Sequence, residues 1–362
     1  MDTFSVKNPT GYYASPIANF TFDILSWKIK QIDADLYVSP NGNDMNLGIS
    51  FHHPLKSISY ALSIIKSSNM NPHTIFLDSG TYSPESTGTI FPLIMISNIS
   101  IKGKGKNQTI LDANKTGWLM NLNDCHNVTI EDVSFLNGYR NSSNGGAAGI
   151  ISFNSNFVIA NSDISTSICE GGECANAGLN TSNSMPILFN VTINDNQADG
   201  SVIGMYNCNP LLINVKITDN HFSWGNYIDD SNPLFINTEI TNNSSFSSYG
   251  SSLMEFRNSI AQLINVTMSE NSFTNNKRDY FLEVSDSRIN IVNSILWNSS
   301  LKELTMEDNF SEIIIVYSNV KGGKEDISGL DENDILNWSL DNTDISKVYF
   351  RNLNKTLFFE TA

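Results

Sequence analysis

The sequence predicts an all-β solenoid. A unit of about two dozen residues recurs through the middle of the chain. In each copy the apolar residues alternate with polar ones, and the alternation shifts by one position at a central Asn or Asp. β-Branched residues are abundant. The seven copies read IEDVSF, IANSDI, LFNVTI, LINVKI, FINTEI, LINVTM and IVNSIL, and they are centred on Asp132, Asn161, Asn190, Asn214, Asn237, Asn265 and Asn293. Successive centres lie between 23 and 29 residues apart. A period this regular indicates one elongated body rather than two ordinary domains.

Each copy predicts two short strands that meet at a corner. In the copy centred on Asn214, Val215 and Ile217 alternate with polar residues, as in a strand with one buried face. Leu212 lies three positions before Val215, so an unbroken strand would turn it to the opposite face. We expect the backbone to bend at Asn214, because Asn tolerates the left-handed conformation. Stacked copies would form a parallel coil with a ladder of corner Asn side chains.

The segment before the repeats predicts a cap on the open end of the coil. Leu55, Ile58, Leu62 and Ile65 share one face of a helix expected near residues 54–67. An uncovered end would expose the edges of the sheets. We expect the segments TIFLDSGTYS and NISIKGKGKNQTILDA, which follow, to form the first rungs.

From about residue 36 to residue 323 the chain resembles the right-handed parallel β-helix proteins of the pectin-lyase-like superfamily. The entry segment LYVSPNGNDMNLGISFHHPLKSISYALSIIKSS is similar to that of secreted bacterial β-helix repeat proteins. The resemblance implies a right-handed parallel β-helix of roughly nine rungs, with a short N-terminal capping helix. It leaves the activity open, because this fold hosts lyases, hydrolases, esterases, adhesins and inert surface proteins.

The ends of the chain lie outside the repeats. We expect residues 1–35 to be an N-terminal extension or the remnant of a longer chain. Residues 324–362 form an acidic C-terminal segment that could cap the coil, with VYFRNLNKTLFFE as a terminal pair of strands. No basic and apolar signal-peptide pattern is visible at the N-terminus, whereas the resemblance favours an extracellular or cell-surface location.

Charge and hydropathy exclude two classes of partner. The net charge is −16, from 21 Lys and Arg against 37 Asp and Glu, which disfavours nucleic acid and anionic membrane surfaces. No run of 18 apolar residues predicts a membrane span. The partner left is a polysaccharide, bound by a monomer or by part of a longer chain.

The four cysteines divide into two pairs. Cys169 and Cys174 lie in the loop CEGGEC, where they can form a local disulfide. Cys125 and Cys208 lie three repeats apart, roughly 14 Å at the spacing of stacked strands, which is beyond the reach of a disulfide. We expect them to be small buried hydrophobes.

Candidate catalytic residues are Asp195, Asp219, Asp229 and Asp230. Asp229 and Asp230 are adjacent in NYIDDSNP, and polygalacturonase-like hydrolases use an Asp pair. Their companion Gly-His-Gly and Arg-Ile-Lys motifs are missing here, and so are the segments typical of pectin methylesterases. A solvated turn is the simpler interpretation of two adjacent carboxylates in a loop.

A column of oxygen-bearing side chains is the candidate metal site. Five residues after successive centres stand Asp195, Asp219, Asn242, Glu270 and Asn298, with Asn196, Asn220, Asn243 and Asn271 beside them. Stacked at about 4.8 Å, such oxygens could hold Ca²⁺, the one cofactor that the sequence suggests. The alternative is that they end strands and form turns.

A carbohydrate-binding surface is predicted from aromatic residues in one loop. His221, Trp224 and Tyr227 follow Asp219 in DNHFSWGNYIDD, and the loops 137–149, with Arg140, and 167–184 come after neighbouring rungs. The alternative is that the aromatic residues only pack against the coil.

Two functions follow from these observations. Strong repeats without a recognisable catalytic motif favour a non-catalytic extracellular or cell-surface protein, a structural or carbohydrate-contacting module. The alternative is a polysaccharide lyase or glycoside hydrolase with an unfamiliar site. The acid surplus disfavours a polyanionic substrate unless Ca²⁺ bridges it.

Overall fold

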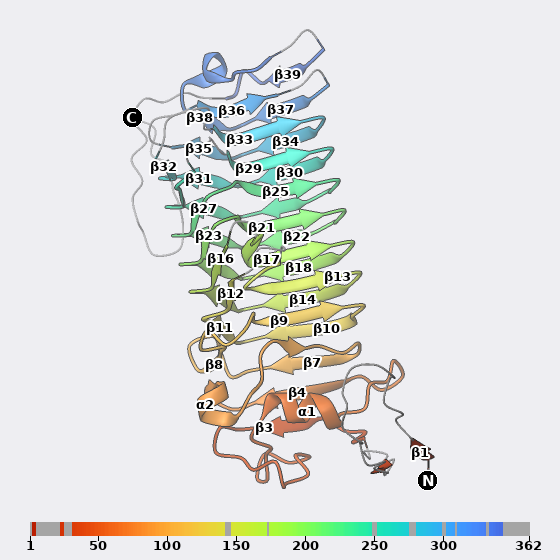
Figure 1. Ribbon diagram of the computed structural model, residues 1–362. Helices are drawn as coiled ribbons and strands as arrows, with labels where there is room; N and C mark the ends of the chain where they lie inside the picture. The colour runs from red at the N-terminus through yellow and green to blue at the C-terminus, as the bar shows by residue number, and fades with distance from the viewer. Residues whose placement is uncertain are drawn as a thin grey trace, which may run out of the picture.

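The chain coils into a solenoid of parallel β-strands that is stacked along one axis (Figure 1). The computed structural model describes residues 31–141, 146–171, 174–247, 252–274, 280–298, 302–307, 310–330 and 333–342. It also gives the backbone of β1 (Asp2–Phe4) and β2 (Phe22–Ile24), which pair antiparallel.

Three long sheets form the walls of the solenoid, and each holds one strand from successive turns. The twelve-stranded sheet contains β3 (Leu36–Val38), β4 (His73–Leu77), β7 (Ile99–Lys102), β10 (His126–Glu131), β14 (Asn156–Ala160), β18 (Met185–Phe189), β22 (Leu211–Ile213), β26 (Leu234–Ile236), β30 (Ile260–Ile264), β34 (Arg288–Val292), β37 (Glu312–Val316) and β39 (Ile335–Trp338). The ten-stranded sheet contains β5 (Gly80–Tyr82), β8 (Thr109–Asp112), β11 (Ser134–Leu136), β15 (Asp163–Ser165), β19 (Thr192–Asn194), β23 (Lys216–Thr218), β27 (Glu239–Thr241), β31 (Thr267–Ser269), β35 (Ile295–Trp297) and β38 (Asn319–Val320).

The third wall and a smaller sheet complete each turn. The nine-stranded sheet contains β6 (Leu93–Ile94), β9 (Met120–Asn123), β13 (Ile150–Phe153), β17 (Asn176–Ser182), β21 (Ser201–Tyr206), β25 (Asn226–Asp229), β29 (Ser252–Arg257), β33 (Tyr280–Ser285) and β36 (Lys302–Met306). The six-stranded sheet contains β12 (Tyr139–Asn141), β16 (Ile168–Glu170), β20 (Gln197–Ala198), β24 (His221–Phe222), β28 (Ser244–Ser245) and β32 (Ser272–Phe273). The chain passes through the walls in the order twelve, ten, six and nine, and this order repeats.

The corner between the twelve-stranded and ten-stranded sheets is the predicted one-residue bend. All seven repeat centres have left-handed backbone, with φ from 49° at Asn161 to 61° at Asp132. The Nδ2 atom of Asn214 donates to Oδ1 of Asn190 at 3.1 Å, and the same bond recurs up the stack as far as Asn293. The predicted exposed asparagine ladder is therefore confirmed.

A second asparagine ladder lies inside the coil. Its members are Asn196, Asn220, Asn243, Asn271 and Asn298. In each step the Oδ1 atom of one Asn accepts from both the backbone N–H and the Nδ2 of the Asn in the preceding turn, at 2.9–3.1 Å. At the last step the carboxylate of the buried Glu303 takes this place and accepts both hydrogen bonds of Asn298.

Apolar side chains fill the interior of the solenoid. Ile164, Ile193, Ile217, Ile240, Met268 and Leu296 stack in one row of the ten-stranded sheet and are at most 1% exposed. Burying each such side chain stabilises the fold by about 1.5–3 kcal/mol. Cys125 and Cys208 are buried and free, as predicted.

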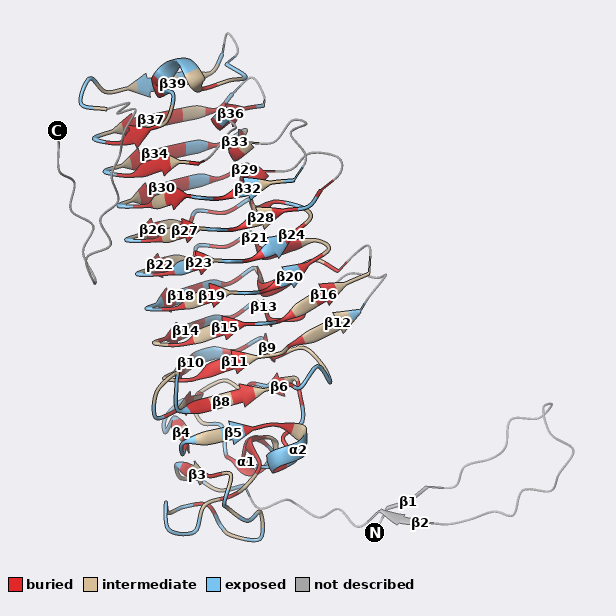
Figure 2. Cartoon of the chain, turned by 90° about the vertical axis from the view of Figure 1, so that its left-hand side faces the viewer, coloured by how far each residue is buried: buried red, intermediate tan, exposed pale blue. Residues whose placement is uncertain are grey.

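The N-terminal end is covered by the predicted capping helix, α1 (Ile58–Ile64) (Figure 2). Ser57 caps its first turn, and Ile58, Ala61, Leu62 and Ile64 are buried beneath it. A second short helix, α2 (Pro84–Thr87), follows β5.

At the other end, a 3₁₀ turn, η1 (Gly323–Asp326), precedes β39. The segment VYFRNLNKTLFFE, expected to close the coil, lies outside the described residues. The architecture is the parallel β-helix, an all-β solenoid with a short capping helix, that the sequence predicted. Among the described residues, no helix is long and apolar enough to cross a membrane.

Candidate functional site

The outer face of the nine-stranded sheet carries an aligned column of polar side chains. Strand register places Tyr227 on β25 beside Glu255 on β29, and Glu255 beside Glu283 on β33. Their strand neighbours Ile228, Met254, Phe256, Leu282 and Val284 point inward and are buried. Alternation along a strand therefore turns the two glutamates outward, one strand spacing or about 4.8 Å apart.

Glu255 lies at the bottom of this site. The residue is only 4% exposed, and its carboxylate forms an ion pair with the half-exposed guanidinium of Arg257, two positions along the same strand. Burial raises the pKa of Glu255, and the charge of Arg257 opposes that rise. The ion pair favours the ionised form of Glu255.

Glu283 is the more perturbed of the two acids. Burial, and after it the negative charges of Glu255 and Glu307, raise the pKa of Glu283 to about 7. The side chain of Glu283 is more exposed to solvent than that of Glu255. Near neutral pH this carboxyl therefore exists partly in the protonated form that a general acid requires.

Aromatic rings and one more carboxylate border the two glutamates. The Cζ atom of Arg257 lies 5.4 Å from the ring centroid of Tyr227, so one guanidinium contacts both Glu255 and an aromatic face. Burial raises the pKa of Tyr227 to about 12, which keeps its hydroxyl protonated. In the neighbouring column, Tyr206, Asp229 and Arg257 are in register on β21, β25 and β29.

The same outer face continues toward the N-terminus with unpaired polar atoms. The Nε1 atom of Trp118, Oδ1 of Asn121 and both amide atoms of Asn176 are buried without a hydrogen-bond partner. The guanidinium of Arg140 lies 4.9 Å from the centroid of the Trp118 ring. Buried groups left unpaired in this way cost free energy unless a ligand or water satisfies them.

Gly204 leaves space beside the Asn176 amide. A Cβ atom at position 204 would come within 2.8 Å of both Nδ2 and Oδ1 of Asn176 and within 3.0 Å of the Tyr206 ring. Gly204 lies in the same outward column as Tyr227. The absence of a side chain at Gly204 therefore makes room for the Asn176 amide over this column.

An apolar cavity of about 320 Å³ lies at the N-terminal end, between α1 and β6. Its lining includes Leu62, Ile90, Pro92 and Ile94, and none of its lining residues titrates. The cavity therefore offers apolar contact area and the hydroxyl groups of Ser59 and Ser63, but no titratable acid or base.

Two of the residues predicted from the sequence lie in this site. Tyr227 and Asp229 are both on β25, half-buried, next to Glu255 and Arg257. Asp230 comes directly after and is an exposed left-handed corner residue with φ 50°. The adjacent Asp229 and Asp230 therefore occupy different places, one on the sheet and one at the corner.

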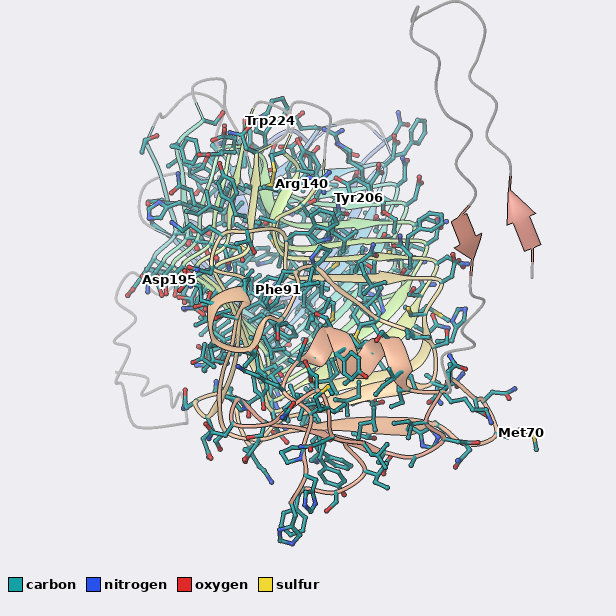
Figure 3. The ribbon with its side chains drawn as sticks, turned by 60° about the horizontal axis from the view of Figure 1, so that its bottom comes forward. Met70, Phe91, Arg140, Asp195, Tyr206 and Trp224 are labelled. Atoms are coloured by element: carbon teal, nitrogen blue, oxygen red, sulfur yellow. A yellow bond between two sulfur atoms is a disulfide. The ribbon has the colours of Figure 1, made fainter. Side chains whose placement is uncertain are left out.

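The predicted calcium column is a row of left-handed corners. Asp195, Asp219, Asn242 and Glu270 have φ between 54° and 59° and are exposed. Within the described residues, no three His, Cys, Asp or Glu side chains are grouped so that they could hold a metal ion. In Figure 3, Asp195 lies at one edge of the molecule, away from Tyr206.

The remaining predicted residues are spread over the six-stranded sheet and its loops. His221 is on β24, where its Nδ1 contacts Ser244 Oγ at 2.6 Å, and Trp224 follows with 55% of its surface exposed. Arg140 is on β12 beside Trp118. Cys169 and Cys174 form a disulfide with their Cα atoms 5.5 Å apart. Arg140, Cys169 and His221 therefore lie on the six-stranded sheet, whereas the two glutamates lie on the nine-stranded sheet.

Sequence reasoning missed Glu255, Arg257 and Glu283. A usable signal was present, because Glu255 and Glu283 each stand ten residues before a corner Asn, Asn265 and Asn293. Equal offsets from equivalent corners predict stacking in a solenoid. Counting outward from the corners in both directions would have found the pair.

No protein-family model and no curated protein matches the sequence. Solved structures that resemble the chain include pectin methylesterase from carrot, with a TM-score of 0.43 and 10% identity over 84% of this chain and 89% of that one. Others are the catalytic domain of a GH87 alpha-1,3-glucanase, with 0.41 and 13% over 79% and 67%, and the GH136 lacto-N-biosidase from Eubacterium ramulus, with 0.38 and 11% over 84% and 68%. These three similar structures are carbohydrate-active enzymes built as β-helices.

Proposed function

We propose that this protein is a glycoside hydrolase that cleaves a neutral polysaccharide on the outer face of the nine-stranded sheet. The observation that carries the proposal is the outward pair Glu255 and Glu283, with the pKa of Glu283 raised to about 7. Hydrolysis of a glycosidic bond needs one protonated and one ionised carboxyl group flanking it. The proposal favours the enzymatic alternative over the non-catalytic module.

Each carboxyl group has a distinct role. Glu283 protonates the leaving oxygen, because its carboxyl holds a proton near neutral pH. Glu255, paired with Arg257, supplies the negative charge that meets the developing oxocarbenium ion. Adjacent strands set the backbones of the two residues about 4.8 Å apart, which allows the carboxyl separation of about 5 Å that is typical of enzymes that retain the anomeric configuration.

The charges around the pair favour an uncharged substrate. Among the described residues of the site, the cation Arg257 interacts with the carboxylates of Glu255 and Glu283 and is in register with Asp229. The carboxylate of Glu307 acts on both glutamates, in a chain of net charge −16. A uronate or sulfated chain would be repelled by this field. A lyase would also need a free basic group to remove a proton, whereas Arg257 is held in the ion pair with Glu255.

The surroundings suit the binding of sugar rings. Tyr227, Tyr206 and Trp118 offer aromatic faces, and Asn121 and Asn176 offer unpaired buried atoms for sugar hydroxyls. The disulfide between Cys169 and Cys174 agrees with an oxidising, extracellular setting for such a substrate.

The experiment is to incubate the protein with a panel of neutral polysaccharides and measure the release of reducing ends. We expect turnover of at least one of them, lowered by about 10²-fold or more in Glu283→Gln, because the amide cannot donate the proton. Glu239→Gln is the matched control, since Glu239 is an exposed, ion-paired acid on the ten-stranded sheet, and it should leave turnover unchanged.

Binding without turnover by the wild type, unchanged in Glu283→Gln, would favour the non-catalytic carbohydrate-contacting module instead. Unsaturated products would identify a lyase.

A further inference from the structure

Two aligned columns on the outer face of the twelve-stranded sheet are uncharged and almost wholly apolar across seven consecutive strands, from β14 to β37. Beside them, the first outward positions of β34 and β37 hold the ion pair of Arg288 and Glu312. Strand register aligns the residues of these two columns. One column holds Val158, Ile187, Leu211, Leu234, Gln262, Asn290 and Ile314, and the other holds Ala160, Phe189, Ile213, Ile236, Ile264, Val292 and Val316. We call these fourteen residues the apolar face.

These side chains are not part of the core. Ile187 and Phe189 are 37% and 39% exposed, and Met185 and Ile260, at the edge of the same face, are 51% and 55% exposed. Apart from Ala160, the members of the apolar face are half-buried or exposed. Single exposed apolar residues need no explanation, but contiguous patches of several hundred Å² mark interaction sites.

The size of the apolar face can be estimated from strand geometry. Seven strands at about 4.8 Å span about 34 Å, and two to three outward columns span about 14–20 Å. The face therefore covers about 500–700 Å², close to the roughly 800 Å² that each partner buries in a standard protein–protein interface.

We propose that the apolar face docks against the same face of a second copy of this chain, so that the protein is a dimer in solution. The two sheets would pack face to face about 10 Å apart, as in a β-sandwich. The interface is isologous, since each copy offers the same surface. This inference is independent of the proposed catalytic role, because the two glutamates lie on a different wall.

Charge favours a second copy over other occupants. The net charge of the chain is −16, so two copies repel each other in most relative orientations. Contact through the apolar face brings no charges together, because none of its fourteen residues is charged. An anionic membrane would require a basic rim, which this acidic chain does not supply. A polysaccharide would require hydrogen-bonding groups, and only Gln262 and Asn290 provide them.

The test is the mass of the full chain in solution, measured by sedimentation over a concentration series. We expect a dimer of twice 40.1 kDa with a dissociation constant on the order of micromolar, given the modest area. Ile236→Asp should raise the dissociation constant by about 100-fold or more, because it places two like charges in an apolar contact. Thr192→Asp, a half-exposed outward position on β19 of the ten-stranded sheet, is the matched control and should remain dimeric.

Val292→Asp on β34 is a second variant that guards against local misfolding at β26. Circular dichroism should show both variants folded. A wild-type chain that stays monomeric at about 100 μM, well above that affinity, would overturn the proposal and leave the face to another partner or to a segment of the same chain. A dimer that Ile236→Asp and Val292→Asp both leave intact would overturn it as well.

Discussion

The outer faces of the nine-stranded and twelve-stranded sheets share one backbone and carry opposite chemistry. Both are parallel sheets of the same solenoid turns, and the inward residues of both are buried and mostly apolar, with Ser152, Thr181 and Asn226 among the polar ones. Outward, one presents Glu255, Arg257 and Glu283, whereas the other presents an uncharged row such as Ile213 and Ile236. The inward positions specify the coil, so the outward positions are free to specify function.

The two outer faces also differ in their effect on the free energy of the folded state. On the nine-stranded sheet, carboxyl groups are held partly out of water, and burial raises the pKa of both Glu255 and Glu283. Desolvated acids of this kind destabilise the folded state when ionised, and they are typical of functional sites. On the twelve-stranded sheet no titratable group stands in the apolar face, and only contact area is offered.

The largest effect that would test this contrast is the loss of Glu255. Glu255→Ala should lower turnover by about 10³–10⁴-fold, because the positive charge of the transition state would lack its nearest carboxylate. Azide added in excess should restore part of the rate if this carboxylate forms the covalent intermediate. Glu312→Ala, which removes an ion-paired acid at the edge of the twelve-stranded sheet, should change turnover by less than about twofold. Equal losses in both variants would mean that the two faces do not differ in function.

A second test concerns the backbone that both faces share. Asn243→Ala should lower the free energy of unfolding by about 3 kcal/mol, because it removes the partners of buried groups on Asn220 and Asn271. Asn214→Ala, in the exposed corner ladder, should cost about 1 kcal/mol through backbone strain and weaker solvated bonds. Urea unfolding measures both. Equal costs would show that the exposed and buried ladders contribute alike.

Removal of the cation at the site should have an intermediate effect. Arg257→Met should reduce turnover about 10–100-fold, because Glu255 would then be protonated more readily. Arg257→Lys should restore part of the activity and shift the pH profile back. A pH profile that is identical in all three proteins would contradict a role for Arg257 in keeping Glu255 ionised.

The smallest expected effect is on stability as a function of pH. The folded-state pKa of Glu283, about 7, lies above the ordinary value of 4.5, so its contribution to stability is present below pH 4.5 and is lost as the pH rises through 7. Glu283→Gln should therefore reduce the fall in Tm between pH 5 and pH 8 by about 2–4 °C. A Tm that falls equally in the variant and the wild type would mean that Glu283 titrates normally.

Much of the fold was predictable because it depends on a local signal that repeats. The corner at Asn214 needs only the parity change between Leu212 and Val215, and the capping helix needs only the spacing of Ile58 and Leu62. The function of Asn196 and Asn220 was not predictable in this way. A residue with left-handed backbone precedes each of these two asparagines and turns the Asn side chain inward. The Asn amides therefore form a buried ladder beside the exposed column of residues that the sequence suggested for Ca²⁺.

The site was harder to predict because it is made by register between strands. Glu255 and Glu283 are 28 residues apart, and each looks like a single polar residue in an apolar strand, in LMEFR and YFLEVS. Their proximity follows only after equivalent corners are aligned. Loop motifs point instead to Asp195 and Asp219, which lie at exposed corners. The sequence favoured a non-catalytic module because it holds no recognisable catalytic motif, and a candidate site made by register between strands leaves no contiguous motif.

The most direct test of the central claim is the titration of Glu283 itself, which needs no knowledge of the substrate. In protein labelled with ¹³C at the glutamate side-chain carboxyl carbons, the resonance lost in Glu283→Gln identifies the group, and its shift is followed from about pH 3 to pH 9. We predict a midpoint near 7, as burial and the neighbouring charges of Glu255 and Glu307 require. A midpoint between about 4 and 5, the range of an ordinary solvated glutamate, would contradict it.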